Sequence, residues 1–228
     1  MIDFYSGTPG SGKSLHTADK IRWALRMKRP IVCNFNITDK LPNYDKCFHY
    51  VPNHELHPDK LIKIAREHFK GKPIKEDTIL LVLDECQLLF NSRDWQQKGR
   101  IEWLSFFTQH RKYGYHIILA AQFDRMIDRQ IRSLIEYEYI HRKLANYGFK
   151  GMFLNLMMGG KTFVAVKVWY PMKEKVGSEF FHARKKLYSI YDTYDTFGVE
   201  AEPKTTTTKD VKVSVGGAEP GGERGPEA

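Results

Sequence analysis

The chain has 228 residues, of which 42% are hydrophobic, so it can form one domain with a sizeable core and a short tail. Its 36 Lys and Arg against 27 Asp and Glu give a net charge of +9, which points to nucleic acid or an anionic membrane face, or else serves solubility alone. No apolar run is long enough to span a membrane, and three scattered cysteines without a C-x-x-C pair fit a reducing compartment and argue against zinc or a disulfide scaffold.

The first predicted element is a short strand at residues 2–5, which runs into a glycine-rich loop. The loop matches G-x-x-x-x-G-K-[ST], the phosphate-binding P-loop, and apolar residues recur at helical spacing after it, from Leu15 to Leu25. Strand, loop and helix is the order that the motif requires, and a glycine-rich turn that only caps a helix is the alternative. The residues predicted to bind nucleotide are Gly7, Thr8, Pro9, Gly10, Ser11, Gly12, Lys13 and Ser14.

Each part of this motif has a chemical task. The glycines allow backbone conformations closed to other residues, so that successive N–H groups surround a β-phosphate at the positive end of the helix. Lys13 is expected to reach the β- and γ-phosphates, and the Ser14 hydroxyl to bind Mg²⁺. The sequence therefore predicts ATP and Mg²⁺ as cofactors.

Strands and helices alternate along the rest of the chain. Two continuous apolar runs, 79–83 and 116–121, are typical of parallel strands buried on both faces. The alternation predicts an α/β fold with a mostly parallel sheet and helices on both faces. The other elements expected are strands at 31–35, 135–143 and 162–170 and helices at 61–69 and 103–110.

Two of the buried strands end in polar residues that would complete the site. Asp84 and Glu85 close the run at 79–83 as a Walker B motif does: Asp84 would hold Mg²⁺ opposite Ser14, and Glu85 would act as general base on the attacking water. Gln122 ends the next buried strand, where it would sense the γ-phosphate or orient water. Solvated strand ends are the alternative. The predicted catalytic residues are Lys13, Glu85 and Gln122, and the predicted metal ligands are Ser14 and Asp84.

Other charged residues suggest partners. An arginine finger acting in trans would require a multimer, and a surface role is the alternative for each candidate. Residues 141–188 hold ten Lys or Arg against two Glu, interleaved with aromatic residues as in many nucleic-acid surfaces. Residues 1–198 are expected to form the ATPase domain, and 199–228 a disordered polar tail. The arginine-finger candidates are Arg111, Arg125, Arg129 and Arg132.

Four features occur together: the P-loop near the start, the sequence L-V-L-D-E-C-Q at 81–87, the stretch 110–122 and the stretch 187–194. Together they resemble the N-terminal domain of the zonula occludens toxin family, over roughly residues 1–197. The resemblance implies an additional-strand P-loop ATPase of the FtsK/HerA-like type, related to the DNA-pumping translocases. It assigns the same roles to the predicted site residues, which are Lys13, Ser14, Asp84, Glu85 and Gln122.

The resemblance also implies a role in filamentous-phage virion assembly and export of single-stranded DNA at the inner membrane. The expected partners are single-stranded DNA or phage assembly proteins, further copies of the chain, and an inner-membrane partner. Family members usually continue through a transmembrane helix, whereas this chain ends in a polar tail, so it is either a shortened piece of such a protein or a member that docks to a membrane partner. We expect it at the cytoplasmic face of the inner membrane. The alternatives are a plasmid or conjugative DNA translocase and a nucleotide-binding module without motor activity.

Overall fold

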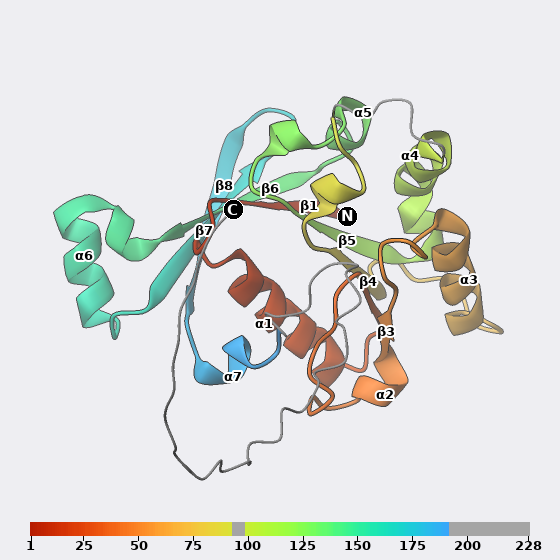
Figure 1. Ribbon diagram of the computed structural model, residues 1–228, viewed down its shortest axis with the longest axis horizontal. Helices are drawn as coiled ribbons and strands as arrows, with labels where there is room; N and C mark the ends of the chain where they lie inside the picture. The colour runs from red at the N-terminus through yellow and green to blue at the C-terminus, as the bar shows by residue number, and fades with distance from the viewer. Residues whose placement is uncertain (93–98, 192–228) are drawn as a thin grey trace, which may run out of the picture. The chain divides into compact units, whose positions relative to one another are not determined.

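The computed structural model of the protein describes residues 1–92 and 99–191 (Figure 1). The chain divides into two units, Met1–Gly198 and Val199–Ala228. The second unit lies outside the described residues, so the disordered tail at 199–228 stays a prediction.

One eight-stranded sheet forms the frame of the first unit, in the order β3-β2-β4-β5-β1-β6-β7-β8. The strands from β3 to β6 in this order pair in parallel, whereas β7 and β8 are antiparallel to their neighbours. The predicted mostly parallel α/β sheet is therefore confirmed. The strands are β1 Ile2–Ser6, β2 Ile31–Cys33, β3 Phe48–Tyr50, β4 Ile79–Leu83, β5 Tyr115–Ala120, β6 Tyr137–Lys143, β7 Thr162–Trp169 and β8 Glu174–His182.

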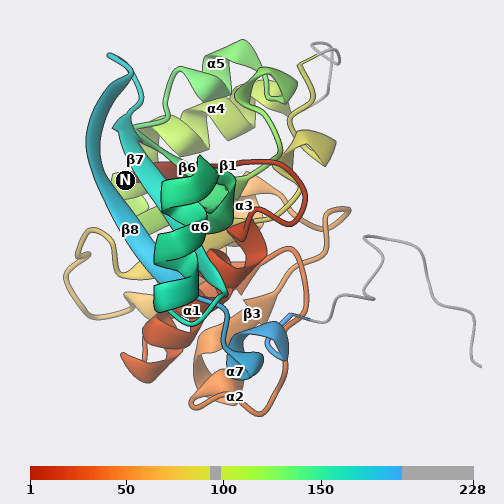
Figure 2. The same cartoon turned by 90° about the vertical axis from the view of Figure 1, so that its left-hand side faces the viewer.

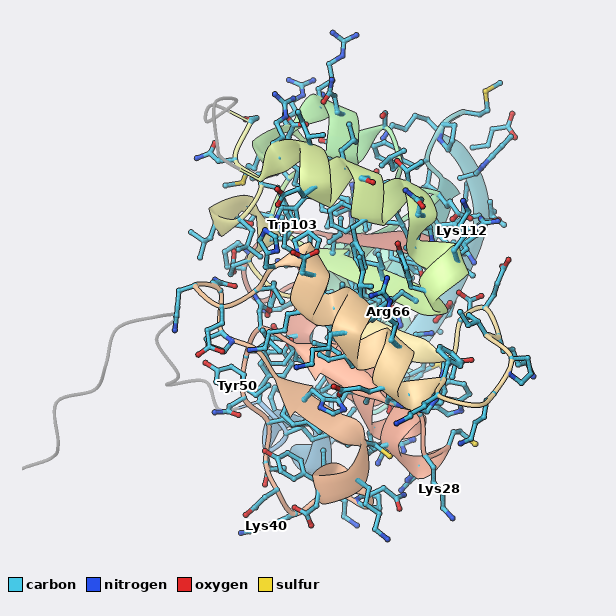
Figure 3. All side chains as sticks on the ribbon, turned by 90° about the vertical axis from the view of Figure 1, so that its right-hand side faces the viewer. Lys28, Lys40, Tyr50, Arg66, Trp103 and Lys112 are labelled. Atoms are coloured by element: carbon cyan, nitrogen blue, oxygen red, sulfur yellow. The ribbon has the colours of Figure 1, made fainter. Side chains whose placement is uncertain are left out.

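Helices cover both faces of this sheet, as predicted. One face carries α1 and α7, and the other carries α3, α4 and α5 (Figures 1 and 2). Figure 3 looks onto the second layer, where Arg66 belongs to α3 and the buried Trp103 to α4. The helices are α1 Lys13–Arg26, α2 Tyr44–Cys47, α3 Pro58–His68, α4 Arg100–Gln109, α5 Arg129–Arg132, α6 Gly148–Met157 and α7 Lys185–Tyr188.

The continuous apolar run of β4 serves two cores at once. Leu81 and Leu83 pack in the core on the α3–α4 side, and Leu80 and Val82 pack in the core on the α1 side. Because side chains alternate across a strand, a strand covered on both faces needs apolar residues at every position. This requirement explains why the central strands could be read from the sequence.

The strand order brings three strand ends together. The strand β5 lies between β1 and β4, with Tyr5 of β1 beside Ala120 and Leu83 of β4 beside Leu119. All three strands run in the same direction, so the loops that follow them begin at the same edge of the sheet. An additional strand between the P-loop strand and the Asp84 strand is the arrangement that the family resemblance implied.

Several elements differ from the sequence expectation. The helix α6 lies between the two later strands, where the sequence suggested only glycine-rich separation. The short strand β3 and the edge strand β8 were not predicted, because each exposes much of its surface and lacks a continuous apolar run. The strand predicted at 31–35 ends at Cys33, and the one predicted at 135–143 begins at Tyr137.

Candidate nucleotide-binding site

A cavity of about 500 Å³ lies where β1, β4 and β5 end. The P-loop residues from Pro9 to Ser14 line it, and so do the polar residues predicted from the two neighbouring strands. Gly7 and Thr8 precede this lining, and the Lys13 ammonium donates a hydrogen bond of 2.5 Å to the Gly7 carbonyl. The lining residues outside the P-loop are Leu15, Asp84, Glu85, Gln122, Lys143, Phe163, Leu187, Tyr188 and Tyr191.

The P-loop needs glycine at two positions for reasons visible in the structure. Gly7 has φ 139°, and a Cβ there would lie 2.7 Å from the His141 carbonyl oxygen. Gly12 has φ 100°, and a Cβ there would lie 2.7 Å from the Phe163 ring. The backbone N–H of Gly7 donates to the Gln122 carbonyl at 3.2 Å, which ties the start of the loop to the end of β5.

The loop also has the chemistry to hold phosphate. Within the described part of the chain, the buried Ser11 hydroxyl has no hydrogen-bond partner, and a phosphate oxygen would satisfy it. Burial lowers the pKa of Lys13, while the nearby Asp84 and Glu85 carboxylates act in the opposite direction. A second ammonium approaches the loop, since Lys143 Nζ lies 3.8 Å from the position of a Cβ on Gly10.

Asp84 is held from both sides at the end of β4. The Asn34 side chain accepts the Asp84 N–H at 2.8 Å and donates to the Asp84 carbonyl at 2.9 Å. One carboxylate oxygen accepts the Glu85 N–H at 2.9 Å, and the other accepts the Tyr191 hydroxyl at 3.2 Å. Burial raises the pKa of Asp84, and these two hydrogen bonds act against the rise.

The donor set fits Mg²⁺ bound together with nucleotide. Among residues 1–92 and 99–191, no three His, Cys, Asp or Glu side chains gather as a complete metal cage. Mg²⁺ commonly binds through one or two carboxylates together with substrate phosphates. The Asp84 carboxylate and the Ser14 hydroxyl line the same cavity as the phosphate-binding loop, so they suit that arrangement.

Glu85 has an unusual backbone conformation. Its φ of 46° and ψ of 42° lie in the left-handed region, which is costly for a residue with a side chain. The Gln87 side-chain amide donates a hydrogen bond to the Glu85 carboxylate. Strained residues of this kind cluster at functional sites, because the surrounding structure must hold them in place.

Sequence reasoning missed the cover of the cavity. Lys143 and Phe163 come from the strands on either side of α6, and Tyr188 and Tyr191 come from the segment around α7. The Tyr191 ring stacks on Phe35 with 4.6 Å between centroids. The signal available was the stretch 187–194, which contributed to the family resemblance without a chemical role.

The arginine-finger candidates do not reach this cavity. Within residues 1–92 and 99–191, no arginine lines it. Arg111 lies before the amino end of β5 and pairs with Glu136 at 2.8 Å. The other three follow β5, in the turn η3 Asp124–Met126 and in α5, so a role in trans stays a prediction: Arg125, Arg129 and Arg132.

The cations of the basic stretch 141–188 lie in different surroundings, and its role as a nucleic-acid surface stays a prediction. Lys167 lies over the Tyr137 ring at 4.1 Å, and Lys173 pairs with Glu138 at 3.3 Å. Lys186 instead joins three cations from other segments around a cavity of about 420 Å³. These three are Arg22, Arg26 and Lys40.

Comparisons with known proteins place the sequence in a family. A profile of the Zonular occludens toxin (Zot) family matches residues 1–197. The Gene 1 protein of Enterobacteria phage fd is 31% identical over 211 residues, which are 86% of this chain and 60% of that protein. The chain therefore spans about 60% of the length of the curated relatives it matches.

Solved structures share the fold. The N-terminal domain of zonular occludens toxin from Neisseria meningitidis matches with a TM-score of 0.54 and 18% identity, over 84% of this chain and 98% of that domain. B204, the DNA-packaging ATPase from Sulfolobus Turreted Icosahedral Virus, matches with a TM-score of 0.50 and 15% identity, over 80% and 96%. The predicted resemblance and the P-loop ATPase fold are confirmed.

Proposed function

Because the chain belongs to the Zonular occludens toxin (Zot) family, we propose that it hydrolyses ATP to drive the export of phage DNA or the assembly of virions. The observation that carries this proposal is the single cavity where the P-loop meets Asp84, Glu85 and Gln122. A relative from a phage favours this cargo over a plasmid or conjugative element. A module that only binds nucleotide would not need a carboxylate such as Glu85 beside the phosphate loop.

The residues divide the chemistry among them. The P-loop N–H groups and Lys13 would hold the phosphates, and Ser14 and Asp84 would hold Mg²⁺, which supplies charge to neutralise the phosphates when bound. Glu85 takes the proton of the attacking water, and its strained backbone fixes where the carboxylate points. Gln122 lies at the end of β5, beside the P-loop, where its amide orients water or the γ-phosphate.

We propose single-stranded DNA as the partner that stimulates this activity. The four cations around the 420 Å³ cavity offer point charges to a phosphate backbone without reading bases. The working unit would be a homo-oligomer at the cytoplasmic face of the inner membrane, joined to a membrane partner. In such an assembly a neighbouring copy would supply the arginine that the described part of this chain does not place in the cavity.

ATP turnover measured with and without single-stranded DNA tests this function. We expect stimulation by DNA that weakens as salt rises, and weaker stimulation when Arg26 and Lys40 are both changed to Glu. Lys112→Glu, an exposed lysine outside both cavities (Figure 3), is the matched control. Turnover without any response to DNA would leave an ATPase with another cargo, and the absence of turnover would refute the enzyme assignment.

A further inference from the structure

The helix α6 presents a row of exposed apolar side chains. Their spacing of i, i+3, i+4, i+7 and i+8 places them on one face of the helix. Apolar residues with this spacing normally face a core, so a row left in the open marks an interaction surface. The α6 stripe consists of Phe149 (79% exposed), Met152 (55%), Phe153 (58%), Leu156 (74%) and Met157 (72%).

The opposite face of α6 ties the helix to the domain. A Cβ on Gly151 would lie 2.5 Å from the Leu144 carbonyl oxygen, so this face packs closely on the preceding turn. The Asn155 side chain accepts the Thr162 N–H at 3.0 Å and donates to the Gly160 carbonyl at 3.2 Å. With Gly151 and Asn155 fixed in this way, the exposed stripe lies on the side away from these contacts, and α6 stands apart from α1 and α3 (Figure 1).

The chain segments that flank α6 in the sequence carry charges of one sign only. From residue 139 to residue 173 the chain has no Asp or Glu, and it has six Lys or Arg. Two of them flank the helix and are exposed away from the nucleotide cavity, namely Arg142 and Lys161, whereas Lys143 lines that cavity. An apolar helical face bordered by cations is typical of helices that lie in the interface of an anionic bilayer.

We propose that α6 docks this domain on an anionic lipid bilayer, with the stripe at the acyl boundary and the flanking cations among the headgroups. With 10 residues the helix is about 15 Å long, too short to cross a bilayer, so it would lie in the interface. No helix in residues 1–92 and 99–191 is long and apolar enough to span a membrane. A bilayer accounts for the stripe better than a symmetric contact between two copies, because such a contact would bring the same cations face to face.

This inference goes beyond the ATPase function, because none of the described side chains of α6 lines the nucleotide cavity. Vesicle binding can therefore fail while ATP turnover persists, or persist while turnover fails. The two proposals can be tested separately on the same protein.

Co-sedimentation of the full chain with vesicles is the test. The wild type should bind vesicles of phosphatidylglycerol and phosphatidylcholine, and bind pure phosphatidylcholine much more weakly. Phe153→Ser combined with Leu156→Ser should weaken binding to the anionic vesicles about tenfold or more, because two stripe residues no longer enter the acyl boundary. The matched control is Ile74→Ser combined with Ile101→Ser, two residues exposed elsewhere by 55% and 82%, which should bind as the wild type does.

Melting temperature and binding of a non-hydrolysable ATP analogue should be the same in both double variants and the wild type. Three results would overturn the proposal: equal vesicle binding by the stripe variant, equal binding to neutral and anionic vesicles, or equal loss in the control. The proposal would also be overturned if the wild type bound no vesicles and formed a dimer that the stripe variant could not form.

Discussion

The nucleotide cavity is made by two regions of different character. The loops after β1, β4 and β5 supply the charged chemistry, with Lys13 and two carboxylates at one edge of a buried parallel sheet. The region from β6 to Tyr191 supplies the cover, with aromatic rings such as that of Phe163 and that of Tyr191 itself. The first region is anchored in two cores, whereas the second is an antiparallel extension with much exposed surface. The phosphate chemistry is therefore fixed by the core, and its environment is set by segments far away in the sequence.

The largest expected effect comes from the first region. Lys13→Ala removes the P-loop ammonium, so ATP turnover should fall about 10²–10³-fold and ATP should bind more weakly. A steady-state phosphate-release assay and a nucleotide titration measure both quantities. Lys63→Ala, an exposed lysine of α3, should change neither. Turnover at the wild-type rate in Lys13→Ala would place the chemistry elsewhere.

The contact between the two regions can be broken at Gly12. Gly12→Ala should lower the free energy of unfolding by about 1–2 kcal/mol, because its backbone is left-handed. It should lower it further because the new Cβ would lie 2.7 Å from the Phe163 ring. Gly71→Ala has a similar φ of 72° and nothing within 4 Å of its Cβ, so it should cost the backbone term only. Since Gly12 and Phe163 both line the nucleotide cavity, Gly12→Ala should also weaken nucleotide binding, and adding Phe163→Ala should restore part of that affinity. Equal losses of melting temperature in the two alanine variants would show that the ring contact is unimportant.

A buried histidine joins the regions beneath the P-loop. His141 of β6 lies with its Nε2 2.8 Å from His16 Nδ1 and its Nδ1 3.1 Å from the Ser6 carbonyl. Burial, with the His16 ring and Lys13 nearby, lowers the pKa of His141 to about 3, whereas an unfolded histidine titrates near pH 6.5. As the pH falls below about 6.5, only the unfolded chain gains this proton. The free energy of unfolding should then fall by up to about 1.4 kcal/mol per pH unit.

Thermal unfolding between about pH 8 and about pH 5 measures this dependence. His141→Gln cannot titrate and should lose stability less steeply with falling pH, even if it is less stable at every pH. His54→Gln, which changes an exposed histidine, is the control and should follow the wild type. A slope in His141→Gln as steep as in the wild type would mean that other groups set the acid sensitivity.

A smaller effect is expected where the cover touches Asp84. Tyr191→Phe removes the hydroxyl that donates to the Asp84 carboxylate at 3.2 Å, at a typical cost of about 0.5–1.5 kcal/mol. Within the described part of the chain, the change leaves the Asp84 carboxylate with only the Glu85 N–H to hold it in place, so the Mg²⁺ concentration for half-maximal turnover should increase several-fold. Tyr188→Phe, which changes another residue that lines the cavity, is the control and should leave the Mg²⁺ requirement unchanged. An unchanged Mg²⁺ requirement in Tyr191→Phe would show that the Tyr191 hydroxyl does not help Asp84 to bind Mg²⁺.

What the sequence could predict follows the same division. The run 79–83 and the P-loop carry local signals, because a doubly covered strand must be apolar throughout and a phosphate loop needs fixed glycines. Tyr191 reaches Asp84 across 107 residues, and no local pattern encodes that contact. The apolar stripe of α6 lies among glycines, which are typical of loops. The sequence therefore predicted a loop between two strands at this position and not a helix.

The central claim is that this cavity hydrolyses ATP with Glu85 as the base, and Glu85→Gln tests it most directly. The change keeps the shape of the side chain and removes its ability to take a proton. ATP binding with Mg²⁺ should be retained while turnover falls about 10²-fold or more. Glu67→Gln, in exposed α3 surface, should leave both unchanged. Wild-type turnover in Glu85→Gln, or equal loss of binding and turnover, would contradict the role that we assign to this residue.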